Sequence, residues 1–179
     1  MPMNILVLVG SPRASGNTEI LADAFIKGAM KNGNSVDKVN LRKLKIDGCL
    51  GCRYCIAHES KCVLRDDMDQ IYPLIDNADM IVFATPVYFY TMSAQIKAVI
   101  DRLYAKHNFD FKINKCALLA VAADDGDVFE PLISTYEHIV SYLKWENVGM
   151  VTANCVSNKG DILGRDELKL AEQLGESIS

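Results

Sequence analysis

The sequence lacks any long hydrophobic run. Its first apolar stretch, Ile5 to Val9, ends at Gly10, and no positively charged side chain precedes it. Such a run is too short for the apolar core of a secretory signal or for a helix that spans a bilayer. We therefore expect a cytoplasmic protein that makes no membrane contact.

A strong excess of one charge is also missing, and histidine is scarce. The 179 residues carry a net charge of −4, and three of them are histidine. A mildly acidic chain has no electrostatic footprint for nucleic acid. It contains no HExxH pattern for catalytic zinc. We expect neither a nucleic-acid partner nor a zinc hydrolase.

What is present is typical of a globular α/β domain. Half of the residues are apolar and 23% are charged, so the chain can bury a core. Continuous apolar runs alternate with stretches of helical periodicity, which predicts a parallel sheet covered by helices on both faces. We expect one domain, 1–179, with strands at 5–9, 35–40, 79–85, 115–123 and 148–155 and helices at 17–31, 66–77, 93–107, 129–144 and 166–178.

The segment Gly10 to Thr18 joins the first strand to the first helix and is rich in hydrogen-bond donors. Glycines allow a close backbone approach, hydroxyl and amide side chains can donate, and the helix dipole favours an anion. The segment has neither the lysine of a P-loop nor a GxGxxG pattern. It predicts a site for a phosphate monoester; the alternative is an ordinary capped helix start.

A second unusual segment, 85–92, follows the third predicted strand. It places three consecutive aromatic residues, Tyr88, Phe89 and Tyr90, before a helix. A flat ring held against them would explain aromatic side chains in such a loop. The alternative is that they fill space under the loop or form a subunit contact.

Four of the six cysteines lie close together, with the spacing C-x2-C-x2-C-x6-C: Cys49, Cys52, Cys55 and Cys62. Four thiolates can hold a [4Fe–4S] cluster, and the first two spacings match a ferredoxin-like run. The last gap is longer than in that run. A zinc site fits less well, because it usually consists of two separated C-x2-C pairs. The thiols could also be redox-active without metal.

Three segments together carry a resemblance to a known family: GSPRASGNT, TPVYFYTMSAQIKAVIDR and CLGCRYCIAHESKCVLRDDM. Over residues 3–155 the chain resembles the NAD(P)H-dependent FMN reductases and their near relatives, the iron–sulfur flavoproteins. The resemblance implies a flavodoxin-like three-layer sandwich, whose five-stranded parallel sheet has the order 2-1-3-4-5, with non-covalently bound FMN.

The resemblance also implies roles for residues in three loops. The FMN phosphate would be held by Ser11, Arg13, Ser15, Asn17 and Thr18. The isoalloxazine ring would lie along Pro86, Val87, Tyr88 and Phe89, with Ala123, Asp124 and Asp125 closing its other side. No side chain is assigned a catalytic role, because the flavin itself carries the chemistry.

The implied function is an oxidoreductase that passes hydride or electrons from NAD(P)H through FMN to a small acceptor such as a quinone, a flavin, or a nitro or azo compound. The alternative is an electron carrier, in which a [4Fe–4S] cluster on Cys49, Cys52, Cys55 and Cys62 exchanges electrons with a partner protein. In cluster-free relatives these cysteines line a loop at a subunit contact or near the flavin. A homodimer or homotetramer is expected.

Overall fold

The computed structural model describes residues 2–106 and 111–179. The strands are β1 (Asn4–Val9), β2 (Ser35–Asn40), β3 (Met80–Tyr88), β4 (Thr91–Met92), β5 (Lys115–Val121) and β6 (Glu146–Ala153). The α-helices are α1 (Asn17–Lys31), α2 (Tyr54–Ala57), α3 (Met68–Asn77), α4 (Ala94–Arg102), α5 (Glu130–Leu143) and α6 (Asp166–Glu176). Short 3-10 turns cover Leu41–Lys43, Leu103–Lys106 and Asp127–Phe129. Within the described residues, no helix is long and apolar enough to cross a bilayer.

The strands form one sheet in the order β2-β1-β3-β5-β6, and all pairs along this path are parallel. This confirms the predicted order 2-1-3-4-5 of five parallel strands. The structure adds β4, which pairs antiparallel with the end of β3. The strand order reverses next to β1, so the carboxyl ends of β1 and β3 form the crevice in which such sheets bind ligands.

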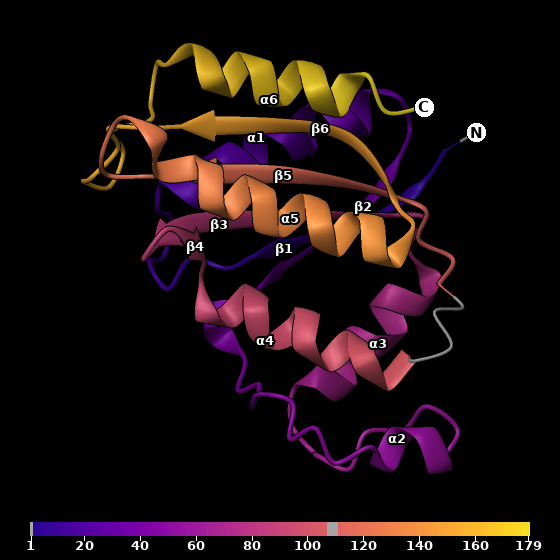
Figure 1. Cartoon of the computed structure of the whole chain (residues 1–179). Coiled ribbons are helices and arrows are strands. Elements are labelled where there is room, and N and C mark those ends of the chain that lie inside the picture. The colour runs from indigo at the N-terminus through magenta and orange to yellow at the C-terminus, as the bar shows by residue number, and fades with distance from the viewer. Residues whose placement is uncertain (1, 107–110) are drawn as a thin grey trace.

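Alternate residues of the central strands feed two separate cores. On one face, Leu8 and Phe83 pack with α3, α4 and α5. On the other, Val7 and Val82 pack with α1 and α6. Figure 1 shows this three-layer arrangement, with α1 and α6 on one face of the sheet. Because both faces are covered, the strands have to be apolar throughout, which is how their sequence reads.

Close contact between α1 and α6 depends on two glycines. A Cβ atom on Gly28 would lie 1.9 Å from the carbonyl oxygen of Glu172, and one on Gly175 would lie 2.1 Å from that of Phe25. The helix backbones therefore touch, and any larger side chain would push them apart. This contact fixes α1, whose N-terminus faces the ligand crevice.

Element ends differ from the prediction in several places. The third strand runs on to Tyr88 and turns back as β4, so the predicted loop 86–92 is mostly a β-hairpin. The predicted helix 93–107 is α4 followed by a 3-10 turn, and its last residue lies outside the described residues. The helix predicted from 66 begins at Met68, because the Asp66 carboxylate accepts a hydrogen bond from the Met68 N–H at 3.0 Å.

Candidate functional site

The loops that follow the parallel strands meet at one edge of the sheet. Val9 is in register with Asn40 on one side and with Ala84 on the other, and Val121 is in register with Ala153. The strands therefore end together. The segments after β1, β3, β5 and β6 form a common surface around the N-terminus of α1, as the register and Figure 1 show.

The α1 N-terminus carries the donors expected of an anion site. Gly16 precedes the helix, and no side chain caps it. The first-turn N–H groups of Asn17, Thr18 and Glu19 have no acceptor within the helix, and the helix dipole adds partial positive charge. Ser11 and Thr18 lie nearby and are buried. The local electrostatics therefore favour a negatively charged group at this end.

Arg13 and Asn17 connect this loop to the segment after β6. Arg13 Nη1 donates to the carbonyl of Ser157 at 2.7 Å. Asn17 Nδ2 donates to the carbonyls of Val156 and Asn158, and its Oδ1 accepts from the Gly160 N–H. The Asn17 amide is thus used to hold 156–160 in place, and its backbone N–H remains the group that can meet an anion.

Ser15 lies away from the cavities. Its φ is 49°, it is exposed, and its N–H donates to the Glu19 carboxylate at 2.8 Å. Burial raises the pKa of Glu19, but the hydrogen bond from Ser15 and the contact with Lys38 outweigh this and lower it. Glu19 therefore stays ionised and fixes the loop, while Lys38 and Arg42 balance its charge.

Two adjoining cavities lie at this edge. The first has a volume of about 120 Å³ and is lined by Ser11, Arg13, Asn17, Thr18, Pro86, Val87, Tyr88, Val121, Ala122, Ala123, Val156 and Ser157. The second, about 250 Å³, is lined by Val87, Phe89, Tyr90, Ala122, Ala123, Asp124 and Val128. They share Val87, Ala122 and Ala123. Polar groups gather at the α1 end, and apolar and aromatic groups gather around β3 and β5.

The β3–β4 hairpin has a turn of unusual composition. Tyr88 pairs with Thr91, so Phe89 and Tyr90 are the two turn residues, with φ of 47° and 64°. Turns with two positive φ angles normally contain Asn and Gly, and a larger residue costs about 1–2 kcal/mol at each position. Phe89 is 100% exposed and Tyr90 60% exposed. A strained turn that presents two aromatic rings to solvent suggests a binding role.

The structure brings ten of the twelve residues predicted for FMN around these two cavities: all but Ser15 and Asp125. Sequence reasoning missed the segment after β6, where Val156 and Ser157 line the first cavity. The sequence did contain a signal for this segment, because it follows a predicted parallel strand and ligands bind beyond the carboxyl ends of such strands. Two larger grooves of about 570 Å³ flank α4 and are lined by none of the predicted residues.

The four clustered cysteines line one small cavity of about 20 Å³, together with Arg102 and Tyr104. Cys49 and Cys52 are exposed, Cys62 is half-buried and Cys55 is buried. Burial raises the pKa of the Cys55 thiol. Four thiols are the ligand set of a [4Fe–4S] cluster, but these four only line the same small cavity. In the described part of the chain, no group of three or more His, Cys, Asp or Glu side chains is arranged to hold a metal ion.

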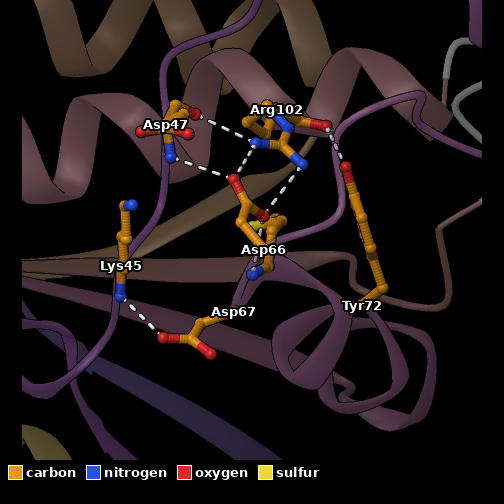
Figure 2. A network of polar contacts seen from close by, with 7 residues as sticks. Lys45, Asp47, Asp66, Asp67, Tyr72 and Arg102 are labelled. Carbon is orange, nitrogen blue, oxygen red and sulfur yellow. Dashed lines mark hydrogen bonds and ion pairs between the residues drawn. The ribbon is translucent and has the colours of Figure 1, made fainter.

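A buried ion pair joins the two ends of the cysteine segment, residues 48–65. The Arg102 guanidinium, 1% exposed, donates to both carboxylate oxygens of Asp66 at 2.7 and 3.2 Å and to the carbonyl of Asp47 at 2.9 Å. Asp66 also accepts the Asp47 N–H, and Asp67 accepts the Lys45 N–H. Figure 2 shows this network, in which α4 ties together the two ends of residues 48–65.

The charges in this network are fixed by mutual contact. Burial raises the pKa of Asp66, but the hydrogen bonds from Arg102 and the Asp47 N–H outweigh it, so the net pKa is lowered. Burial by itself lowers the pKa of Arg102. The hydrogen bond to Asp66 outweighs this effect, so the net pKa of Arg102 is raised. Burial also raises the pKa of Tyr72, which donates to the Arg102 carbonyl, to about 12.

Comparison with known proteins identifies the family of the chain. The profile of the NADPH-dependent FMN reductase family matches residues 3–153. An iron–sulfur flavoprotein of Archaeoglobus fulgidus is 35% identical over 99% of this chain and 79% of its own. The NAD(P)H-dependent FMN-containing oxidoreductase YwqN of Bacillus subtilis is 30% identical over 94% of this chain and 93% of its own.

The chain belongs to the NADPH-dependent FMN reductase family. It is accordingly an FMN-dependent oxidoreductase that takes its electrons from NAD(P)H. Among solved structures, a NAD(P)H:quinone oxidoreductase from Methanothermobacter marburgensis superposes with a TM-score of 0.79 at 19% identity, covering 98% of this chain and 96% of that one. An azoreductase from Bacillus anthracis superposes with a TM-score of 0.75 at 14% sequence identity, covering 98% of this chain and 100% of that one. At these identities the likeness establishes the flavodoxin-like fold.

Proposed function

We propose that FMN binds across the two cavities, with its phosphate at the α1 N-terminus and its ring along the end of β3. One observation carries the proposal: loops that are far apart in the sequence place donors at one end of a groove and apolar residues at the other. Ser11, Arg13, Thr18 and the α1 N–H groups hold the phosphate, while Asn17 positions the loop after β6. Pro86, Val87, Tyr88, Phe89, Ala123 and Asp124 surround the ring.

The residues at each end suit the part of FMN assigned to them. Charge-assisted hydrogen bonds from backbone N–H groups and a guanidinium suit a phosphate dianion. Pro86, Val87 and Ala122 offer apolar surface for a flat heterocycle. When bound, FMN supplies hydride and electron transfer. The chain binds and orients it and leaves one approach open for a second flat molecule.

The overall reaction balances without a catalytic side chain. NAD(P)H gives up a hydride, which is two electrons and one proton, and solvent supplies a second proton. A quinone that takes up the hydride equivalent and the solvent proton becomes a hydroquinone, and NAD(P)+ is released. Nitro and azo compounds or a free flavin would accept electrons in the same place. The neighbours named as quinone oxidoreductase and azoreductase support this range of small acceptors.

The phosphate assignment is tested by comparing FMN with riboflavin, which lacks the phosphate. Arg13→Ala is expected to weaken FMN binding by about 10- to 100-fold, because a hydrogen bond to a charged group contributes about 1.5–3 kcal/mol. Riboflavin binding should change little, and Arg13→Lys should restore part of the loss. Arg65→Ala, an exposed arginine of the cysteine segment, is the matched control. Equal weakening of both ligands by Arg13→Ala would place the phosphate elsewhere.

A second function, electron carriage through an iron–sulfur cluster, is suggested by the four cysteines that line one cavity, although in the described residues they are not arranged to hold a metal ion. The names of relatives in Archaeoglobus fulgidus and Methanosarcina thermophila point the same way. Iron and sulfide assays on anaerobically purified protein decide between the two. Stoichiometric iron that is lost on Cys52→Ser supports the carrier. Rapid NAD(P)H oxidation by iron-free protein supports the reductase.

We further propose a cytoplasmic location and a homodimeric or homotetrameric assembly. All six cysteines are free thiols, which suits a reducing compartment. One of the grooves beside α4 is lined by the exposed Tyr104 and the half-buried Ile100, which offer apolar area for a subunit contact. Sedimentation of the FMN-loaded protein measures the assembly, and a monomer at micromolar concentration would refute it.

A further inference from the structure

The turn before α1 has a conformation that its residue types do not favour. Ser15 has a φ of 49°, in the left-handed region that a residue other than glycine seldom adopts unless its surroundings hold it there. The turn is also tight, because a Cβ atom on Gly16 would lie 3.2 Å from the Cβ of Arg13. Such a turn needs an interaction that stabilises it.

That interaction comes from the first turn of α1. The Ser15 N–H donates to Oε2 of Glu19 at 2.8 Å, and Glu19 is only 9% exposed. A hydrogen bond to an ionised acceptor is stronger than one between neutral groups. Glu19 lines neither of the two cavities. It can therefore act on a ligand there through the loop or through its charge, but not by contact.

The charge of Glu19 is balanced from the end of β2. Lys38 Nζ lies 3.3 Å from Glu19 Oε1, and Arg42 Nη2 lies 3.6 Å from Glu19 Oε2. Both cations reach the phosphate loop because β2 ends beside β1, with Asn40 in register with Val9. An unbalanced carboxylate at this helix end would repel a phosphate dianion. The two cations offset that repulsion, so the hydrogen bond is left as the main effect of Glu19.

From these contacts we infer that Glu19 is a positioning residue for FMN: its carboxylate holds the Ser15 N–H and so fixes the phosphate loop before the ligand binds. The inference rests on the proposed function and adds to it a residue that lines neither cavity. A loop that is already ordered loses less entropy when it binds a ligand. Loss of the anchor should therefore weaken the phosphate part of FMN binding and spare the ring part.

The first experiment measures the dissociation constant of riboflavin divided by that of FMN, a ratio that isolates the phosphate contribution. Glu19→Ala removes the acceptor and is expected to lower this ratio about tenfold, the scale of one hydrogen bond to a charged group. Glu19→Gln keeps a side-chain oxygen that can accept the Ser15 N–H, so the ratio should stay near its native value. Asp23→Ala is the matched control, because Asp23 also lies on α1 and pairs with Lys38 at 2.7 Å; it should leave the ratio unchanged.

Other roles for Glu19 predict different patterns in the same variants. If Glu19 acted only as a negative charge near the phosphate, Glu19→Ala and Glu19→Gln would both raise the ratio, since each removes the repulsion. If Glu19 served only the stability of α1, Glu19→Ala would weaken FMN and riboflavin equally. Either pattern would overturn the inference.

Amide hydrogen exchange, followed by NMR in the FMN-free protein, tests the anchor itself. The Ser15 N–H is expected to exchange at least about tenfold faster in Glu19→Ala than in the native protein or Glu19→Gln. The Ile20 N–H, which donates to the Gly16 carbonyl at 3.0 Å, should be unchanged and so report that α1 is intact. Equal Ser15 exchange in the native protein and Glu19→Ala would overturn the inference and leave the proposed function standing. A native protein that binds FMN and riboflavin equally well would instead refute the proposed phosphate site.

Discussion

The carboxyl edge of the sheet and the cysteine segment are built in different ways. At the sheet edge, loops leave strands that end in register, and the α1 N-terminus is fixed by backbone contact with α6. The cysteine segment, residues 48–65, contains only the four-residue helix α2, and Figure 1 shows it below α3 and α4, away from the sheet. Its ends are tied by a single buried ion pair, Asp66–Arg102.

This difference suggests that the two regions respond differently to mutation. Many small contacts and the sheet itself hold the edge, so no one side chain there decides the fold. The cysteine segment depends on a buried charge pair, and removal of either partner lowers the free energy of unfolding. The regions can therefore be separated by experiment: one should lose ligand binding without unfolding, and the other should lose stability first.

The largest effect is expected for Asp66→Ala. Removal of the carboxylate leaves the Arg102 guanidinium buried without its counter-charge, which costs about 3–5 kcal/mol in the free energy of unfolding. Urea denaturation of the FMN-free protein measures this loss. Asp101→Ala is the matched control, because Asp101 also pairs with a cation, Lys97, but on the exposed surface, where a pair contributes about 0–1 kcal/mol. Similar losses in the two variants would show that the cysteine segment does not depend on the buried pair.

A smaller loss is expected for Gly175→Ala, which tests the scaffold of the sheet edge. The new Cβ would lie 2.1 Å from the Phe25 carbonyl oxygen, so α1 and α6 must move apart. Overpacking of this kind costs about 1–3 kcal/mol, more than the gain of alanine over glycine in helix propensity. FMN affinity should fall with stability, because the α1 N-terminus moves. Gly48→Ala, where a Cβ meets nothing within 4 Å, should be neutral in both urea denaturation and FMN titration.

The features predicted from sequence are those encoded locally. Buried strands such as Ile5–Val9 are apolar without interruption, and the donors after the first strand stand next to one another in the chain. The residues themselves therefore predict the buried strands and the donor-rich loop after the first strand, whereas the strand order and the ten residues that line the cavities follow from the family resemblance. The role of Asn17 was less visible, because its three partners lie more than 130 positions away.

The features that sequence reasoning missed arise from contacts or conformations with no local signal. Phe89 and Tyr90 do not resemble the Asn-Gly pair of a tight hairpin turn, so β4 was not predicted. Asp66 stands just before α3 in the sequence, whereas its main partner is Arg102, 36 positions away. An aspartate and an arginine that lie this far apart in the sequence carry no local signal that they pair with each other.

Acid should weaken the cysteine segment through the same ion pair. The pKa of Asp66 is held below its ordinary 3.8 in the folded state. Its contribution to stability is therefore complete above about pH 4 and is lost as the pH falls through the lowered value. Urea denaturation between pH 5 and pH 3 should show a steeper loss of stability in the native protein than in Asp66→Asn. Parallel curves would show that the carboxylate has the same pKa in both states.

The smallest effect is expected at the sheet edge, for the reduction potential of bound FMN in Asp124→Asn. Electrons that enter the site add negative charge near the Asp124 carboxylate, so removal of that carboxylate should raise the potential. A unit charge in water at about 4 Å contributes about 1 kcal/mol, which corresponds to on the order of 20 mV for a two-electron couple. Spectroelectrochemical titration measures the shift, with Asp37→Asn as the control. Because Asp124 is exposed and Asp66 is buried, the same loss of one carboxylate should here change a potential slightly and leave the free energy of unfolding within about 0.5 kcal/mol of the native value.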